Sequence, residues 1–537
     1  MLIRNAVPWS GCRLDGDTIA IANGVIAGVG SLDDVRALAY PAGPEIDAGG
    51  GLVTAGFGDC HIHLGVVAMD ALQCNLAGAT SIDECLSRVA AFAASSSRPW
   101  VSGGGWDLAL FNGGYPTAAQ LDTVVSDRPA LLLNADHHGA WVNSAALRAA
   151  GIEASTPDPA DGRIERNPDG TPSGMLNEGA VQLVARVMPS PSTDELARAI
   201  GGAADRVLAT GITTWQEAAL GAYGGFPDFT DAYREALARG LVRGRPSGAI
   251  WTPRDLTVER IPGFLAGAAV SRDVNTASGF PTPTIKLMLD GIVETRTAAL
   301  RDPYLGDGAD GSRGLSYFDP EFIQRLISAA NAEGFAVHVH AIGDRAVGDA
   351  LDGFAAAAPE DRAAVRNHIA HVQLIDERDV PRFAALGVTA NLQPFWAYES
   401  QLTRQRTIPL LGEHRASRLF VFGELQRAGA RTAMGSDWPV SDFDPWQGIH
   451  VAVTRRAPGD TVTPPLAPEQ ALTLEYALDA YTRGSAELLG EGTGLLRVGE
   501  RADLAIANRN PFEGDEADIH LTSTRATVVD GVLVAGE

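Results

Sequence analysis

The chain has 537 residues, more than one hydrophobic core usually organises, which predicts a large barrel with appended parts or about two to three domains. Its 42 basic residues stand against 66 acidic ones, a formal net charge of −24, so we expect neither a nucleic-acid partner nor binding to an anionic membrane. We find no run of about 18 apolar residues and no N-terminal signal pattern, and we therefore expect a soluble, cytoplasmic protein.

Both ends of the chain are rich in short predicted strands. Residues 17–22 and 25–29 flank Asn23-Gly24, a strong hairpin signal. Near the other end, 503–507 reads as a strand, and 526–529 faces 532–535 across Asp530-Gly531. Each piece is too small to be stable alone. We expect residues 1–53 and 486–537 to form one composite β-sandwich, with two unrelated terminal hairpins as the alternative.

Between these ends, predicted helices and strands alternate. The segments 193–209 and 320–333 have helical spacing, and each precedes an apolar run. The strand-like runs are 211–215, 284–288, 335–340, 368–372, 388–392 and 432–435. Such alternation predicts a parallel sheet covered by helices, and the length suits a (β/α)8 barrel of the TIM type. We expect this α/β barrel over 54–485, with an insertion at 70–190.

The segment Gly56–Leu64 contains two histidines that alternate with other residues. It follows residues 51–55, which read as a strand leading into a turn, and side chains alternate faces along an extended chain. His61 and His63 therefore point the same way, as two nitrogen ligands of one metal ion would. Taken alone, the pair could equally be satisfied polar groups. Cys60 points to the opposite face and is better explained by packing.

Four further polar residues lie at or near the ends of later strand-like runs: Lys286, His340, His371 and Asp437. In a parallel barrel the C-terminal strand ends form the face that carries the active site. Taken singly, each has a structural explanation, such as a helix cap or a buried polar group. Together with His61 and His63 they would supply nitrogen and oxygen ligands for one or two divalent ions. His338 shares a face with His340, so spacing does not choose between them.

In this order the residues resemble the signature of the amidohydrolase superfamily: His-x-His after strand 1, Lys after strand 4, His after strands 5 and 6, and Asp after strand 8. More narrowly, the chain is similar to the branch that contains N-substituted formamide deformylase. This similarity extends over essentially the whole chain and includes 140–147, 286–291 with 296–300, and 340–344. The terminal sandwich, including 494–504, also resembles that of the superfamily.

The resemblance implies a catalytic role for Asp437, Lys286 and His340. His61, His63 and Asp437 would hold one ion, expected to be Zn²⁺, and His340 and His371 a second, bridged by an N-carboxylated Lys286. The metal would acidify a water molecule, and Asp437 would take its proton and return it to the leaving nitrogen. Family position favours His340 over His338. Mononuclear members use the same histidines and aspartate, so the metal count stays open.

The predicted function is hydrolysis of a non-peptide C–N bond in a small molecule, such as an amide, an N-formyl compound or a cyclic amide. The alternatives are an esterase, lactonase or carbamate hydrolase on the same site, and a non-catalytic binding relative. We expect the 70–190 insertion to cover the substrate, and a homodimer is the default assembly. The expected substrate contacts, for which core packing is the alternative at each tryptophan, are Trp106, His138, Trp141, Arg296, Trp396 and Trp438.

Overall fold

The computed structural model describes residues 1–40, 43–111, 115–135, 139–159, 162–223, 226–306 and 311–536. The chain forms two compact units. One comprises Met1–Gly65 and Ile200–Glu537, and the other comprises Val66–Ala199.

Eight parallel strands form the centre of the first unit, in an order that follows the sequence around the sheet. Neighbouring strands pair in parallel along the whole series. The strands are β7 (Phe57–Ile62), β14 (Ile212–Leu220), β15 (Arg245–Trp251), β16 (Thr284–Met288), β17 (Ala336–Ala341), β18 (His368–His371), β19 (Thr389–Leu392) and β20 (Thr432–Met434). The prediction of a parallel barrel with alternating helices is confirmed.

The first and last strands approach one another and nearly close the barrel. The backbone N–H of Asp437 donates to the carbonyl of His61 at 2.7 Å, and that of His63 donates to the carbonyl of Trp438 at 2.9 Å. Lower in the barrel, the Asn391 amide donates to the Cys60 carbonyl at 2.8 Å. The first two bonds join β7 and the residue after it to the segment after β20, and the third joins β7 to β19, so residues that are far apart in sequence meet at one edge.

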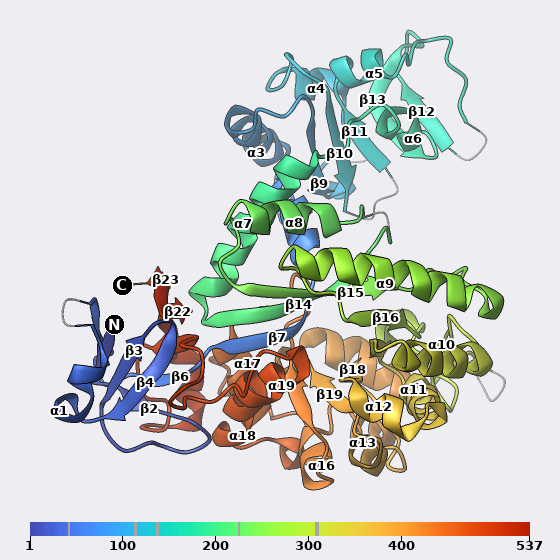
Figure 1. The fold of residues 1–537 in the computed structure, drawn as a ribbon. Coiled ribbons are helices and arrows are strands. Elements are labelled where there is room, and N and C mark those ends of the chain that lie inside the picture. Colours follow the sequence, from blue (N-terminus) through green and yellow to red (C-terminus); the bar gives the residue numbers. More distant parts are fainter. Residues whose placement is uncertain are drawn as a thin grey trace. The chain divides into compact units, whose positions relative to one another are not determined.

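The outer layer consists of helices that follow the strands (Figure 1). They include α7 (Thr193–Ala209), α8 (Thr230–Ala238), α9 (Ile261–Ala277), α10 (Pro320–Ala332), α11 (Asp344–Ala356), α13 (Val380–Leu386), α16 (Phe422–Arg427), α17 (Pro445–Thr454) and α19 (Ser485–Leu489). In α10, Asp319 caps the first turn by accepting from the Phe322 N–H at 2.8 Å. Phe322, Leu326 and Ala330 recur at four-residue spacing and are buried, which fixes the face that packs inward.

The two ends of the chain form two sheets that share one core (Figure 1). One sheet has the order β4-β3-β1-β5, and the other has the order β2-β6-β21-β22-β23. Both predicted hairpins are present, with Ala22 opposite Val25 and Val529 opposite Val532. Their strands are β1 (Leu2–Arg4), β2 (Val7–Pro8), β3 (Thr18–Ala22), β4 (Val25–Gly30), β5 (Glu45–Asp47), β6 (Leu52–Ala55), β21 (Leu504–Ala507), β22 (Thr524–Val529) and β23 (Val532–Gly536). The expected sandwich built from both termini is confirmed.

His61 lies on a separate strand, β7, and His63 follows it, which corrects the expectation that residues 51–55 lead directly into the histidine pair. β6 pairs with β21 in the terminal sandwich, whereas β7 is the first barrel strand. Gly56 separates the two, and its N–H donates to the Asp503 carbonyl at 2.8 Å. A Cβ at Gly56 would lie 2.2 Å from the Thr213 Oγ1, so the crossing between sheets requires glycine.

The second unit has a six-stranded sheet of order β12-β13-β11-β10-β9-β8. Its strands are β8 (Cys74–Asn75), β9 (Val101–Trp106), β10 (Ala130–Asn134), β11 (Gly139–Val142), β12 (Gly162–Arg166) and β13 (Pro172–Glu178). Helices α3 (Ile82–Ser95), α4 (Ala118–Asp122), α5 (Ser144–Ala149) and α6 (Val181–Ala185) belong to the same unit. Among all described residues, no helix is both long enough and apolar enough to cross a bilayer.

Candidate metal centre

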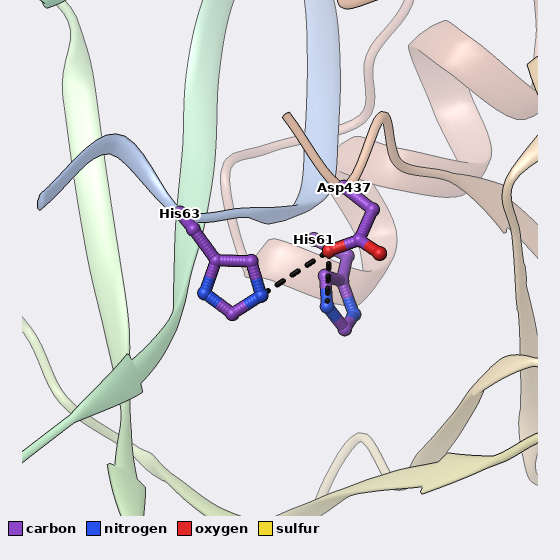
Figure 2. Close-up of side chains that lie close together, drawn as sticks. All are labelled: His61, His63 and Asp437. Carbon is purple, nitrogen blue, oxygen red and sulfur yellow. Dashed lines mark ion pairs between the residues drawn. The ribbon is translucent and has the colours of Figure 1, made fainter. Parts of the chain in front are cut away.

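Three predicted ligands meet at the end of the barrel strands. His61 is in β7, His63 follows it, and Asp437 lies just after β20 (Figure 2). The Asp437 Oδ1 is 3.2 Å from the Nε2 of His61 and 3.2 Å from the Nε2 of His63. One ligand atom from each of the three residues lies within 4.8 Å of the others. Two imidazole nitrogens and a carboxylate oxygen form a donor set that suits Zn²⁺ or a similar ion.

The charge states of this group also suit a metal ion. Burial, reinforced by Lys286, lowers the pKa of His61 well below its ordinary value, so its imidazole is neutral. Burial would raise the pKa of Asp437, but the neighbouring His61 and His63 hold it well below the ordinary value. Among the described residues, no lysine or arginine forms an ion pair with Asp437. A buried carboxylate beside neutral imidazoles is a typical cation site.

The backbone at two predicted ligands has an unusual conformation. Asp437 has a φ of 58°, His371 a φ of 77°, and Val372, which follows it, a φ of 44°. Positive φ is uncommon outside glycine and is a marked outlier for a β-branched valine. Such conformations persist only where the surroundings enforce them, and they concentrate at functional sites.

The other predicted ligands lie on the neighbouring strands β16 to β18. The rings of His340 and His371 are adjacent, with centroids 4.4 Å apart. The His340 Nε2 is 3.4 Å from the Gly291 carbonyl oxygen, and the buried Nδ1 of His371 has no hydrogen-bond partner among the described residues. Lys286 is 3% exposed, and burial lowers its pKa to about 7. These residues are close to one another but do not converge on one atom as His61, His63 and Asp437 do.

The alternative histidine, His338, precedes His340 by two residues on β17 and lies deeper in the barrel. Strand register places it opposite Lys286 on one side and His368 on the other. Its Nε2 is 2.9 Å from the His61 Nδ1 and 3.3 Å from the Lys286 Nζ. His338 therefore contacts the predicted ligands His61 and Lys286 from deeper in the barrel. The sequence showed only that His338 and His340 share a face and did not predict these contacts.

Polar residues that the sequence analysis did not select support His63. Tyr223 places its hydroxyl 3.2 Å from the His63 Nδ1, and the Glu217 Oε1 lies 4.0 Å from the same atom. Glu217 is fully buried, and its Oε2 accepts from the Gly65 N–H at 2.9 Å and from the Tyr233 hydroxyl at 2.7 Å. Burial raises the pKa of Glu217. In the sequence, the signal that could have identified Glu217 is the polar pair Gln216-Glu217 inside an otherwise apolar strand.

Two more buried carboxylates organise the backbone around the ligands. Asp59 accepts from the N–H groups of His61 at 3.1 Å and Ser436 at 3.0 Å, which ties β7 to the segment that carries Asp437. Asp290 accepts from the N–H groups of Ala299, Ile342 and Gly343 at 2.8 to 3.0 Å. Burial raises the pKa of each carboxyl to about 7.

The predicted substrate contacts fall in different places. Trp106 and Trp141 are both 0% exposed in the core of the second unit, and their indole N–H groups donate to the Leu132 and Thr117 carbonyls. This burial agrees with core packing, the alternative given above for each tryptophan. His138 lies outside the described residues.

The remaining three candidates belong to the first unit. Trp396 stacks parallel on His371 with ring centroids 5.1 Å apart. Trp438 packs against Phe443 and beneath the Arg206 guanidinium. Arg296 is exposed and ends a short helix with a φ of 59°. Among the described candidates, Trp396 stacks on the predicted ligand His371, and the Trp438 carbonyl accepts from the His63 N–H.

Comparison with known proteins decides the family. The sequence profile of the amidohydrolase family matches residues 44–535. The chain belongs to the amidohydrolase family. YtcJ of Bacillus subtilis, named as an amidohydrolase, is 30% identical over 525 residues, which is 96% of each chain. The N-substituted formamide deformylase of Arthrobacter pascens is 27% identical and is covered over 94% of its length by 96% of this chain.

A solved structure shows the same fold. An uncharacterized metal-dependent hydrolase from Pyrococcus furiosus superposes with a TM-score of 0.70 at 24% identity, covering 94% of this chain and 97% of that one. The family and the His-His-Asp group together support a metal-dependent hydrolase.

Proposed function

We propose that this protein hydrolyses a non-peptide C–N bond in a small amide, N-formyl compound or cyclic amide, using one or two divalent metal ions, with Zn²⁺ as the expected ion. The observation that carries the proposal is the approach of the Asp437 Oδ1 to the Nε2 atoms of both His61 and His63 at 3.2 Å. The similarity to a formamide deformylase supports the choice of bond.

His61, His63 and Asp437 would hold one ion. A divalent ion in such a site supplies a water acidified to near neutrality and polarises the oxygen of the bond to be cleaved. Asp437 is buried and ionised, so it is suited to accept the proton of the attacking water. An amide nitrogen leaves poorly as an anion, and Asp437 can return that proton to it. The attacking oxygen forms the C–O bond first, and the C–N bond breaks once the nitrogen has received the proton, which yields a carboxylic acid and an amine.

We further propose that Lys286 is N-carboxylated and completes a second ion site with His340 and His371. An ammonium group would repel cations, whereas a carbamate offers two oxygens. Lys286 is suited to the modification because it is buried, has no ion pair among the described residues, and has a pKa of about 7. At neutral pH a large share of it is therefore a free amine, the form that reacts with CO2.

A substrate panel tests the proposal. Purified protein, assayed for bound metal, is offered matched N-formyl amines, N-acyl amines, cyclic amides, esters, lactones and dipeptides. We expect turnover of the C–N compounds, its loss after chelation and its recovery with Zn²⁺. Turnover of esters or dipeptides alone would contradict the choice of bond. A chain that binds no divalent ion would contradict the proposal as a whole.

All four cysteines are free thiols, which fits the proposed cytoplasmic location.

A further inference from the structure

A continuous row of hydrogen bonds lies beneath His61. His338 is fully buried in the barrel interior, and its Nδ1 is 2.8 Å from the Oε1 of Gln216. Its Nε2 is 2.9 Å from the His61 Nδ1 and 3.3 Å from the Lys286 Nζ. The family signature described above assigns no function to His338 or Gln216.

The neighbours of His338 determine which of its nitrogens carries hydrogen. The Gln216 amide nitrogen donates to the Thr284 hydroxyl at 3.2 Å, so its carbonyl oxygen faces His338 and accepts from Nδ1–H. On the other side, the Lys286 Nζ carries hydrogen whether it is an ammonium, an amine or a carbamate, so it can donate to Nε2. Both contacts are therefore satisfied with hydrogen on Nδ1 and a lone pair on Nε2.

The lone pair on the His338 Nε2 also determines which nitrogen of His61 carries hydrogen. With an acceptor 2.9 Å away, the His61 Nδ1 carries the single hydrogen of its neutral ring. Its Nε2, which lies 3.2 Å from the Asp437 Oδ1, is left with a lone pair on the side where the ligands converge. A metal-binding imidazole needs this arrangement, and a partner on its other nitrogen commonly provides it.

We propose that His338 and Gln216 are positioning residues that fix the tautomer of His61 and thereby set the affinity of the metal site. The inference rests on the proposed function, since it assumes that His61 holds an ion. It also assigns the two histidines of β17 to different tasks: His340 lies beside His371, while His338 orients His61 and contacts Lys286.

The test measures the affinity for Zn²⁺ by competition with a chromogenic chelator, separately from turnover. Gln216→Met removes the acceptor at nearly constant size, whereas Gln216→Glu keeps an acceptor at the same position. His338→Met removes both ring nitrogens. We expect Gln216→Met and His338→Met to weaken Zn²⁺ binding by about 10- to 100-fold and Gln216→Glu to stay close to the unsubstituted protein. Thermal melting of each metal-free variant confirms that it is folded.

His368→Gln is the matched control. His368 is a buried histidine on the next strand whose ring lies 4.2 Å from that of His338, and its Nδ1 is 3.2 Å from the Arg366 carbonyl oxygen. We expect this variant to keep its Zn²⁺ affinity. If His338→Met does not fold, the two Gln216 variants decide the question.

The outcomes separate the two proposals. An unsubstituted protein that binds no Zn²⁺ would contradict the proposed function. If it binds Zn²⁺ and Gln216→Met binds as tightly, the positioning role is wrong. The role is also wrong if Gln216→Glu loses as much affinity as Gln216→Met, because both variants lose the amide N–H that donates to Thr284, and that loss would then explain both.

Discussion

The two halves of the candidate metal centre differ in how completely the protein assembles them. On β7 and after β20, one carboxylate oxygen lies 3.2 Å from two imidazole nitrogens, and the backbone of both segments is held by Asp59. On β16 to β18, His340 and His371 are adjacent, but Lys286 contacts His338 instead of either of them. The first half is preformed by protein groups alone, and the second lacks an anionic ligand that a carbamate would supply.

The largest effect should follow from removing the carboxylate that defines the first half. Asp437→Asn keeps the size of the side chain but can neither accept a proton nor balance the charge of an ion. We expect kcat to fall by at least about a thousandfold, measured on the best substrate of the panel. Asp442→Asn, which alters an exposed aspartate nearby, is the control and should retain activity. Full activity in Asp437→Asn would disprove its role in proton transfer.

Removing the lysine should affect the second half alone. For Lys286→Gln we expect the metal content to fall from about two ions per chain to about one, measured by elemental analysis. In protein equilibrated with ¹³C-labelled bicarbonate, we expect a carbamate carbon signal that is absent from this variant.

A chemical rescue makes the prediction on Lys286 sharper. In Lys286→Ala, added acetate or propionate can supply the missing carboxylate and should restore part of the second ion and of the activity. If the unsubstituted protein binds two ions without any carbamate signal, Lys286 carboxylation is wrong. If it binds one ion and is fully active, the second half has another role.

Acid should destabilise the protein through buried histidines of the second half. Burial lowers the pKa of His340 to about 3, from an ordinary value near 6.5. Between these values the unfolded chain binds more protons than the folded one, so stability falls as pH drops below 6.5 and no longer falls below 3. The slope from this group is at most about 1.4 kcal/mol per pH unit.

The measurement is the free energy of unfolding of metal-free protein in urea at several pH values between 4 and 8. His340→Gln should lower the slope below pH 6.5 and leave the pH dependence of stability above pH 7 unchanged. An unchanged slope in this variant would show that His340 does not contribute to the acid sensitivity.

The sequence predicts the fold and the ligand set better than it predicts neighbours across the barrel. Turn residues such as Asn23-Gly24 act locally, so the hairpins and most barrel strands could be placed, and the order of the six ligands pointed to the metal centre. The contact between Lys286 and His338 depends on strand register, which no local pattern encodes. Likewise, the indoles of Trp106 and Trp141 look the same in sequence whether they line a site or fill a core.

The smallest expected effect concerns Trp396, which covers one ligand of the second half. Its ring stacks parallel on His371 at 5.1 Å, so Trp396→Leu removes an aromatic contact worth about 0.5–1.5 kcal/mol and leaves the ligands in place. We expect a loss of about 3- to 10-fold in kcat/KM together with weaker retention of the second ion, while the first ion stays bound. Trp396→Phe should recover most of the loss because it restores a stacking ring. If Trp396→Leu instead releases both ions equally, the two halves are a single cooperative site, and the difference drawn between them does not hold.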